Sequence, residues 1–432
     1  MKLLHLLLAP IAALLMLGGC VSNGLEGDNL NEIASDYVQM QLEIGEREEG
    51  YIDAYYGPPE WQAAAKAAPR SVADLAAAAA DLTRRTSAVD PAGLEPMERR
   101  RRGFLLAQLR AASTRLRMIQ GEKLSFADEA EGLFGVRPEL KPLASYDAVL
   151  ARLETLVPGS GTLAERVDAF QNRFTIPKER LQPVFDAAIA ECKRRTLAHI
   201  ALPANEAFTL EFVTGKSWSG YNWYKGNATS LIQVNTDLPI RIGRAVDLGC
   251  HEGYPGHHVY NALLETKLAR QRGWVEFTVY PLYSPQSFIA EGSANYGIDL
   301  AFPGAERMAY ETRALYPIAG ISPADARAYQ ALQEATKDLA GARFTIARDY
   351  LEGRMDKAQA IAAIRKYQLV SAERAQQSLA FTEQYRSYVI NYGLGQDMVR
   401  AYIEAAGPSQ AARWAAMEKI LSEPTLPSEL KR

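Results

Sequence analysis

The octapeptide His251-Glu252-Gly253-Tyr254-Pro255-Gly256-His257-His258 is the stretch of this 432-residue chain that best predicts its fold and chemistry. The chain has five histidines, and three of them lie in these eight residues. A neutral imidazole donates a lone pair near pH 7, which makes histidine the commonest metal ligand. A His-Glu pair followed within two helical turns by another histidine is typical of zinc hydrolase sites. We therefore expect one zinc ion at His251, with Glu252 as the general base that takes a proton from the attacking water and passes it to the leaving amine.

The spacing of these histidines departs from the regular motif, in which histidines at positions i and i+4 share one helix face. Position i+4 is Pro255, and the next histidines are His257 and His258. On an undistorted helix the i+6 residue points to another side, and the i+7 residue lies about 10 Å along the axis. Pro255 lacks an N–H and Gly256 permits unusual backbone angles, so both favour a distorted helix. We expect a bulge at residues 254–255 that brings His257 to the ligand position, with His258 as the alternative ligand.

Four blocks of the sequence resemble the bacterial domain-of-unknown-function 885 family, which is grouped with the zincin-like metallopeptidases. The octapeptide is the most specific block, and the others are Leu231–Thr236, Ala290–Tyr296 and Tyr392–Gly395. The matching blocks span roughly residues 205–400. The resemblance implies a zincin-like fold and a zinc-dependent peptidase activity, which is an argument by analogy.

The resemblance also implies a third metal ligand, Glu291, on a helix expected over residues 288–300. Asn295 lies four residues further on and is expected on the same face, where its side chain would fix the tautomer of a ligand histidine. This chain has Ser293 where the family usually has a large aromatic residue. We expect that difference to alter the pocket rather than the metal site.

The strand expected just before the metal helix, residues 230–235, is a candidate for substrate binding. In zincins an edge strand at this place pairs with an extended peptide. Gln233 and Asn235 are the candidate residues, and Asn235 belongs to a block that resembles the family. A purely structural strand is the alternative interpretation.

Late in the chain, Tyr392 matches the family pattern and is the first candidate for a hydrogen bond to the oxyanion of the transition state. Tyr388 is a weaker candidate, and Arg386 is a candidate for holding a substrate carboxylate. Residues 386–388 replace the Pro-Gly-Gln common in the family. Because the chain has 21 tyrosines, ordinary core packing is the alternative interpretation for each tyrosine.

The first nineteen residues are expected to be a lipoprotein signal peptide. Lys2 is followed by an apolar run, Leu3–Met16, and then by the lipobox Leu17-Gly18-Gly19-Cys20. The run is too short and wrongly flanked for a spanning helix. We expect lipidation of Cys20 and a flexible tether over residues 20–32, which would anchor the protein in the cell envelope. In a host with two membranes, Val21 directly after the cysteine favours anchoring at the periplasmic face of the outer membrane. The alternative interpretation of the first nineteen residues is an ordinary secretory signal peptide followed by a chance cysteine.

Hydrophobic patterning predicts a mainly α protein: an N-terminal helical part over residues 33–200 and a zincin-like catalytic part over 201–432, together one compact unit. Alternating or β-branched residues predict strands at 208–213, 221–224 and 230–234. These strands are expected to form one small sheet next to the metal-binding helix.

The charge and the cysteines narrow the class of protein. A net charge of −3 gives no field that would attract nucleic acid, and the basic run at residues 99–102 is expected to be a solvated helix face. Cys192 and Cys250 would be able to pair in an exported protein. Because Cys250 adjoins His251, where a crosslink would constrain the metal site, we expect two buried thiols.

These patterns predict a zinc-dependent peptidase that acts on small or cell-envelope peptides. One alternative is a metal-dependent amidase on a non-peptide substrate. Another is a non-catalytic lipoprotein with a degenerate site that binds a partner or an envelope polymer; the missing histidine at i+4 makes this alternative credible. The sequence does not specify the oligomeric state.

Overall fold

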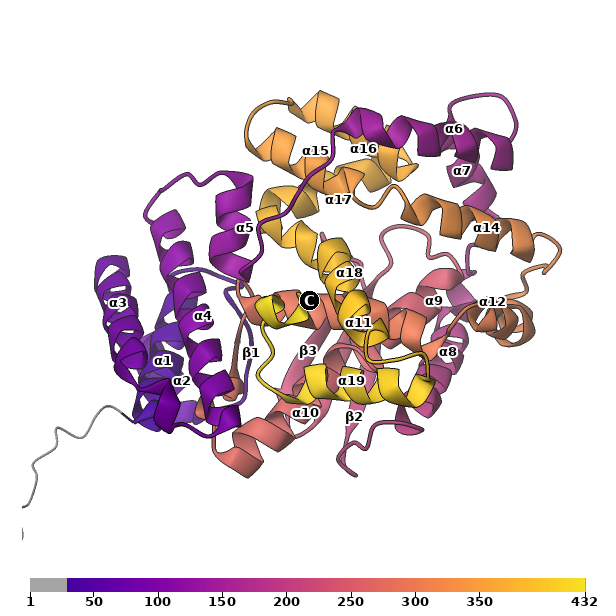
Figure 1. Ribbon diagram of the computed structural model, residues 1–432. Helices are drawn as coiled ribbons and strands as arrows, with labels where there is room; N and C mark the ends of the chain where they lie inside the picture. Colours follow the sequence, from indigo (N-terminus) through magenta and orange to yellow (C-terminus); the bar gives the residue numbers. More distant parts are fainter. Residues whose placement is uncertain (1–28, 432) are drawn as a thin grey trace, which may run out of the picture.

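The computed structural model describes residues 29–431, and over this range the chain is mainly helical (Figure 1). This confirms the predicted fold class. The expected signal peptide, Cys20 and residues 20–28 of the expected tether lie outside the described residues. Helix α1 (Leu30–Gly45) begins with Asn29, whose side chain accepts a hydrogen bond from the Asn31 N–H. Residues 30–32, which we expected in the tether, are therefore helical.

The first group of helices packs side by side at the left of Figure 1. It contains α1, α2 (Pro59–Ala67), α3 (Val72–Ala88), α4 (Pro96–Ile119) and α5 (Phe126–Phe134). Serine N-caps begin α3 and α5, and Gly135 ends α5 in the left-handed conformation. The core of this group also includes Phe288 and Tyr388, which come from late in the chain.

A second group, at the top of Figure 1, joins segments that are far apart in sequence. Its helices are α6 (Asp147–Leu156), α7 (Leu163–Asn172), α14 (Ala326–Lys337), α15 (Ala342–Leu351), α16 (Lys357–Gln368) and α17 (Ala372–Tyr385). They share one hydrophobic core, in which Leu153 and Val167 pack with Leu332 and Leu379. The N-terminal half therefore contributes to both ends of the molecule.

The central group contains the helices that carry the octapeptide and Glu291. Its members are α8 (Leu181–Leu197), α9 (Gly243–Leu248), α10 (His257–Leu264), α11 (Pro285–Ala301), α12 (Glu306–Tyr310), α13 (Tyr316–Ala319), α18 (Ile390–Glu404) and α19 (Gln410–Ser422). Helix α11 runs through the middle and packs against α18 (Figure 1). A Cβ atom on Gly292 would lie 2.5 Å from the carbonyl carbon of Gly395, so this close approach of α11 and α18 requires glycine.

The three predicted strands are present as β2 (Ala207–Val213), β3 (Gly220–Gly226) and β4 (Thr229–Asn235). They form one sheet in the order β2-β4-β3, with β4 parallel to β2 and antiparallel to β3. A second sheet of two antiparallel strands, β1 (Ile52–Tyr55) and β5 (Val279–Pro281), was not expected. Strand β1 lies in a region that we expected to be helical, because its partner is more than 200 residues away and leaves no local pattern.

No helix within residues 29–431 has both the length and the apolar character needed to cross a membrane.

Candidate metal centre and its cavity

The octapeptide forms a sharp break between two helices. Helix α9 continues into a π-helical turn, η4 (Gly249–Gly253), and α10 begins at His257. The Tyr254–Pro255 peptide bond is cis, and the Gly256 N–H donates to the Cys250 carbonyl at 3.0 Å. A Cβ atom on Gly256 would lie 1.7 Å from the His251 carbonyl oxygen, so no other residue fits this turn. The break brings the side chain of His257 to that of His251, as the expected bulge requires.

Three potential ligand atoms converge at this break. The Nε2 atoms of His251 and His257 lie 3.1 Å apart, and the Glu291 Oε2 atom lies 3.1 Å from the first and 3.6 Å from the second. Ligands of a tetrahedral zinc ion at about 2.0–2.1 Å from the metal lie roughly 3.3 Å from one another. The three side chains are thus spaced as zinc ligands would be, and Glu291 comes from helix α11.

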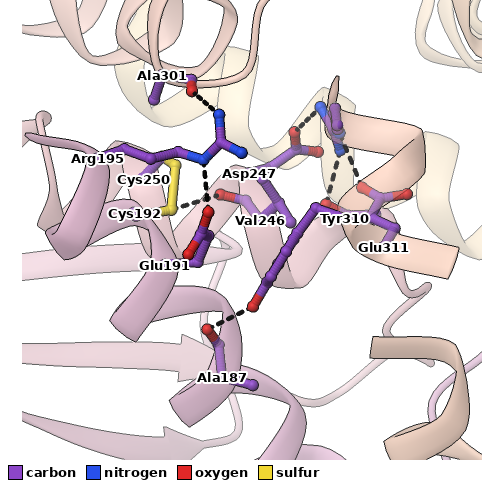
Figure 2. The surroundings of a disulfide bond; sticks show 12 residues. Ala187, Glu191, Cys192, Arg195, Val246, Asp247, Cys250, Ala301, Tyr310 and Glu311 are labelled. Carbon is purple, nitrogen blue, oxygen red and sulfur yellow. Dashed lines mark hydrogen bonds and ion pairs between the residues drawn. A yellow bond between two sulfur atoms is a disulfide. The ribbon is translucent and has the colours of Figure 1, made fainter. Parts of the chain in front are cut away.

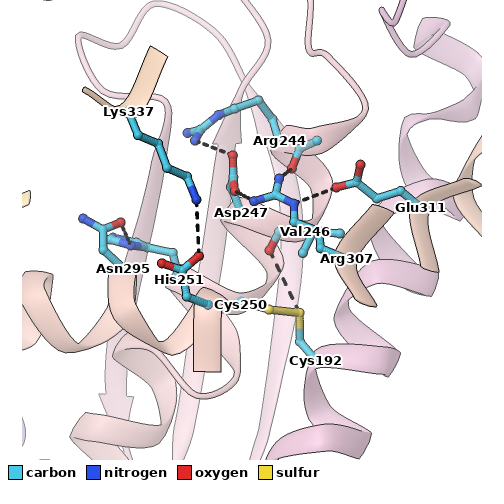
Figure 3. A network of polar contacts seen from close by, with 12 residues as sticks. Cys192, Arg244, Val246, Asp247, Cys250, His251, Asn295, Arg307, Glu311 and Lys337 are labelled. Atoms are coloured by element: carbon cyan, nitrogen blue, oxygen red, sulfur yellow. Dashed lines mark hydrogen bonds and ion pairs between the residues drawn. A yellow bond between two sulfur atoms is a disulfide. The ribbon is translucent and has the colours of Figure 1, made fainter. Parts of the chain in front are cut away.

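The hydrogen bonds around His251 leave its Nε2 lone pair directed into this group. Asn295 donates through Nδ2 to the Tyr392 carbonyl at 2.8 Å, which turns its Oδ1 toward His251. That oxygen lies 3.0 Å from His251 Nδ1 (Figure 3), so the proton of the neutral ring is on Nδ1. The nitrogens beside the buried Glu291 Oε2 are the Nε2 atoms of His251 and His257 themselves, and within residues 29–431 this carboxylate oxygen makes no hydrogen bond to any other group. A cation satisfies such a set of converging lone pairs, so the donor set fits a zinc ion.

The electrostatics of the centre also favour a positive charge between these side chains. Burial alone lowers the pKa of His257, but the carboxylates of Glu291, Glu252 and Asp53 outweigh it and raise the pKa to about 9. Burial raises the pKa of Glu291, and the two histidines more than reverse this, so its pKa is held well below the usual range. The cluster is therefore strongly attractive to a cation.

Glu252 lies beside this group with its carboxylate unpaired. It is 4% exposed, and within residues 29–431 its side chain makes no hydrogen bond or ion pair. Its pKa is raised, mainly by burial. Its Oε1 atom packs so closely on Gly220 of β3 that a Cβ atom there would approach to 2.8 Å. The carboxylate is thus held in place by packing and remains free to accept a proton.

Tyr388 and Tyr392 both reach the centre, in different ways. The buried Tyr388 hydroxyl donates to Glu291 Oε1 at 2.8 Å, which orients that carboxylate. The Tyr392 ring stacks on the His251 ring with centroids 6.2 Å apart. Tyr388 therefore supports the carboxylate of the metal centre, while the Tyr392 hydroxyl remains the candidate for hydrogen bonding to an oxyanion.

The alternative ligand, His258, points away from the centre. Its Nδ1 lies 2.8 Å from Ser230 Oγ, and its Nε2 lies 3.0 Å from Glu206 Oε2. Its side chain is fully buried, and it does not line the cavity described below. Both ring nitrogens are already used, so His258 does not belong to the converging group.

Three other candidate residues differ from expectation. Strand β4 is paired on both edges, so Gln233 and Asn235 do not lie on an edge strand that a peptide could extend. The Asn235 amide instead donates to the carbonyls of Lys216 and Trp218 and holds that loop. Arg386 is paired with the buried Glu129 at 2.8 Å and does not line the cavity, so it is not available to a substrate carboxylate.

The group formed by His251, His257 and Glu291 opens into a cavity of about 500 Å³. Its lining includes groups that the sequence did not single out: Asp53 of β1, Tyr221 of β3 and Arg343 of α15. Burial raises the pKa of Asp53 to about 6, although the Tyr221 hydroxyl donates a hydrogen bond to it. These residues come from three distant segments, and no local motif marks any of them.

Cys192 of α8 and Cys250 of η4 form a disulfide (Figure 2), so the expectation of two free thiols is wrong. The bond joins η4 to α8 at the residue next to His251. Nearby, Arg195 links Glu191 of α8 to the Ala301 carbonyl at the end of α11. The crosslink therefore fastens the backbone of the metal centre to its scaffold, and the expected conflict with the site does not arise.

Comparison with known proteins finds weak similarity to solved structures and no match by sequence. No family model and no curated protein matches the chain, so the resemblance to the domain-of-unknown-function 885 family stays a prediction. One similar solved structure is a "putative lipoprotein" from Colwellia psychrerythraea, with 15% identity, a TM-score of 0.48 and coverage of 82% of this chain and 65% of that one. This chain thus spans less than two thirds of that protein.

A second similar structure is an M32 carboxypeptidase from Deinococcus radiodurans R1. It has 16% identity and a TM-score of 0.40, with coverage of 93% of this chain and 92% of that one.

Proposed function

We propose that this protein is a zinc-dependent hydrolase that cleaves peptide bonds, with His251, His257 and Glu291 as the zinc ligands. The observation that carries the proposal is the convergence of three lone-pair atoms beside an unpaired buried carboxylate, Glu252, in one cavity. Two histidines and one carboxylate form a donor set that zinc prefers in hydrolases. When bound there, zinc supplies a Lewis acid that polarises a carbonyl and acidifies water.

The residues of the chain then have separate roles in hydrolysis. Glu252 takes the proton of the attacking water and delivers it to the leaving amine, for which its raised pKa suits it. Asn295 holds the His251 ring in one tautomer, and Tyr388 orients Glu291. Tyr392 donates a hydrogen bond to the developing oxyanion.

Substrate entry is proposed along β3 rather than β4. Residues 217–222, at the start of β3, line the cavity, and β3 is the strand of its sheet that lies on this side. An extended peptide laid along this segment would place a carbonyl close to Glu252, which packs on Gly220.

The site of action is proposed to be the cell envelope, with the protein anchored through lipidated Cys20. The support is the lipobox in the sequence. Metabolic labelling with a radioactive fatty acid should mark the full chain and should not mark Cys20→Ala.

The hydrolase proposal is tested with Glu252→Gln, which removes the base and leaves the three ligands in place. We expect zinc content to remain near one ion per chain and peptide hydrolysis to fall by about 100-fold or more. Glu206→Gln, which changes a half-buried glutamate of the neighbouring histidine cluster, is the matched control and should keep its activity. Equal activity of Glu252→Gln and the unaltered protein on every substrate cleaved would refute the assignment.

A further inference from the structure

The cations that line the cavity fall into two classes. Five of its lining residues are basic: Arg244, Arg307, Lys337, Arg343 and Arg374. Arg244 and Arg307 pair with Asp247, and Lys337 pairs with Glu334; the Arg244–Asp247–Arg307 network is drawn in Figure 3. Among residues 29–431, no carboxylate pairs with Arg343 or Arg374. The cavity therefore offers two guanidinium groups whose charge the described part of the chain does not neutralise.

Arg343 is the more unusual of these two arginines. Its guanidinium packs over the rings of Phe381 and Tyr392, with its central carbon 5.2 and 5.7 Å from the ring centroids. Its buried Nε has no hydrogen-bond acceptor, and burial lowers the pKa of the group. Arg374, by contrast, donates to the Pro239 carbonyl at 2.6 Å. Arg343 is half-buried, and its guanidinium loses hydration that an anion supplied by a ligand would offset.

The position of Arg343 relates it directly to the metal centre. His251 and Arg343 both contact the Tyr392 ring: the His251 ring stacks on it with centroids 6.2 Å apart, and the Arg343 guanidinium lies 5.7 Å from its centroid. These two distances place Arg343 at most about 12 Å from the His251 ring, roughly three residues of extended chain at about 3.5 Å per residue. An anion on Arg343 is thus within the reach of a peptide whose carbonyl lies at the metal centre.

We propose that Arg343 binds the free C-terminal carboxylate of a short peptide, so that cleavage falls within the last few residues of the substrate. This inference rests on the proposed function and adds the substrate class to it. A guanidinium matches a carboxylate in shape and forms two parallel hydrogen bonds with it. Asp53 and Glu252, also in the cavity, repel an anion from the centre itself and thereby orient the peptide.

The test compares one short peptide with a free C-terminus and the same peptide with a C-terminal amide. The unaltered, zinc-loaded protein should cleave the free acid at least about 100-fold more efficiently in kcat/KM, because the amide leaves Arg343 unpaired. Arg343→Gln should lose about 100-fold on the free acid and less than about 3-fold on the amide. Arg343→Lys keeps the positive charge but cannot form two parallel hydrogen bonds, so its kcat/KM on the free acid should lie between those of the unaltered protein and Arg343→Gln.

Arg348→Gln is the matched control, since Arg348 lies on the same helix and pairs with Asp349 outside the cavity. It should retain the preference for the free acid. Mass spectrometry of the products should locate the cleaved bond within the last three residues. Internal cleavage, or equal losses by Arg343→Gln on acid and amide, would overturn the inference.

Binding provides a readout that does not depend on turnover. Calorimetry with zinc-loaded Glu252→Gln should detect the free acid and not the amide, and Glu252→Gln/Arg343→Gln should bind neither. Equal binding of acid and amide would refute the role of Arg343 and leave the hydrolase proposal standing. Binding of neither peptide, together with no hydrolysis by the unaltered protein, would refute both.

A peptide that ends in glutamate and carries a C-terminal amide distinguishes a side-chain carboxylate from the C-terminal carboxylate. If this peptide is cleaved as well as the free acid, the anion bound by Arg343 is a side chain and the C-terminal assignment is wrong.

Discussion

Two clusters that each combine histidine with glutamate lie at the start of helix α10, and they differ in what their polar atoms contact. His251, His257 and Glu291 direct their lone pairs at one another, and Glu291 Oε2 makes no hydrogen bond to any other group of the described residues. His258 contacts Ser230 and Glu206, and Glu206 also accepts from Lys193 and Tyr254. The first cluster opens into the cavity and the second does not line it.

The difference shows why neighbouring histidines have different roles. A buried polar group with all its partners supplied by the protein stabilises the fold. A buried group without a partner marks a place for a ligand, because leaving it unpaired costs free energy. The Ser230–His258–Glu206 arrangement has the composition of a catalytic triad, yet its serine is buried away from the cavity. We therefore assign it a structural role.

Exchanging the histidines one at a time should give the largest effects. His257→Ala should weaken zinc binding by more than about 100-fold, because it removes a ligand, while the fold is retained. His258→Ala should bind zinc normally but lose about 2–4 kcal/mol of unfolding free energy, because Ser230 and Glu206 lose their partner. Zinc titration and urea unfolding of both variants measure this contrast. Loss of zinc binding by His258→Ala without loss of stability would contradict the structural role of His258.

The disulfide should stabilise the scaffold under the metal centre rather than the metal itself. Replacing Cys192 and Cys250 together with serine should lower the unfolding free energy by about 2–4 kcal/mol, because the bond closes a loop between residues 58 apart. Zinc stoichiometry in the folded variant should remain near one. A variant of unchanged stability that no longer binds zinc would show that the bond acts on the ligands instead.

Removing the hydroxyl that orients Glu291 should have a smaller effect on the metal centre. Tyr388→Phe should weaken zinc binding about 10-fold, since the carboxylate loses its hydrogen bond and the ring packing is kept. Competition with a fluorescent chelator measures the affinity. Tyr283→Phe is the control, because Tyr283 packs against Tyr388 without contacting a ligand; an equal effect there would point to packing.

The smallest effect should be a pH dependence in the structural cluster. Burial raises the pKa of Glu206, but hydrogen bonds from His258, Lys193 and Tyr254 outweigh it and lower the pKa to about 2. Because the folded pKa is below the unfolded value, the stabilisation is present above about pH 4.5 and is lost as the pH falls toward 2. The free energy of unfolding, measured between pH 6 and 3, should fall in the unaltered protein and fall less in Glu206→Gln. Identical pH profiles for the two proteins would contradict the role assigned to Glu206.

The sequence predicted the parts of the molecule that carry local patterns. The helical periodicity, the three strands around residues 207–235 and the convergence of His257 on His251 all follow from neighbouring residues. Strand β1, with Asp53, and Arg343 were missed because contacts across most of the chain place them at the cavity. The central position of β4 was missed because alternation predicts a strand without giving its neighbours.

The cysteine prediction failed for a related reason. We expected that a crosslink beside His251 would distort the metal site. In the fold, α8 lies directly against η4, so the disulfide joins segments that are already adjacent. Sequence separation alone does not report such proximity.

Crystals of the zinc-loaded protein, with anomalous scattering recorded at the zinc edge, test the central claim most directly. We predict a single strong anomalous peak within bonding distance of His251 Nε2, His257 Nε2 and Glu291 Oε2. A peak bound by His258 and Glu206 instead, or no peak in crystals grown with excess zinc, would contradict it.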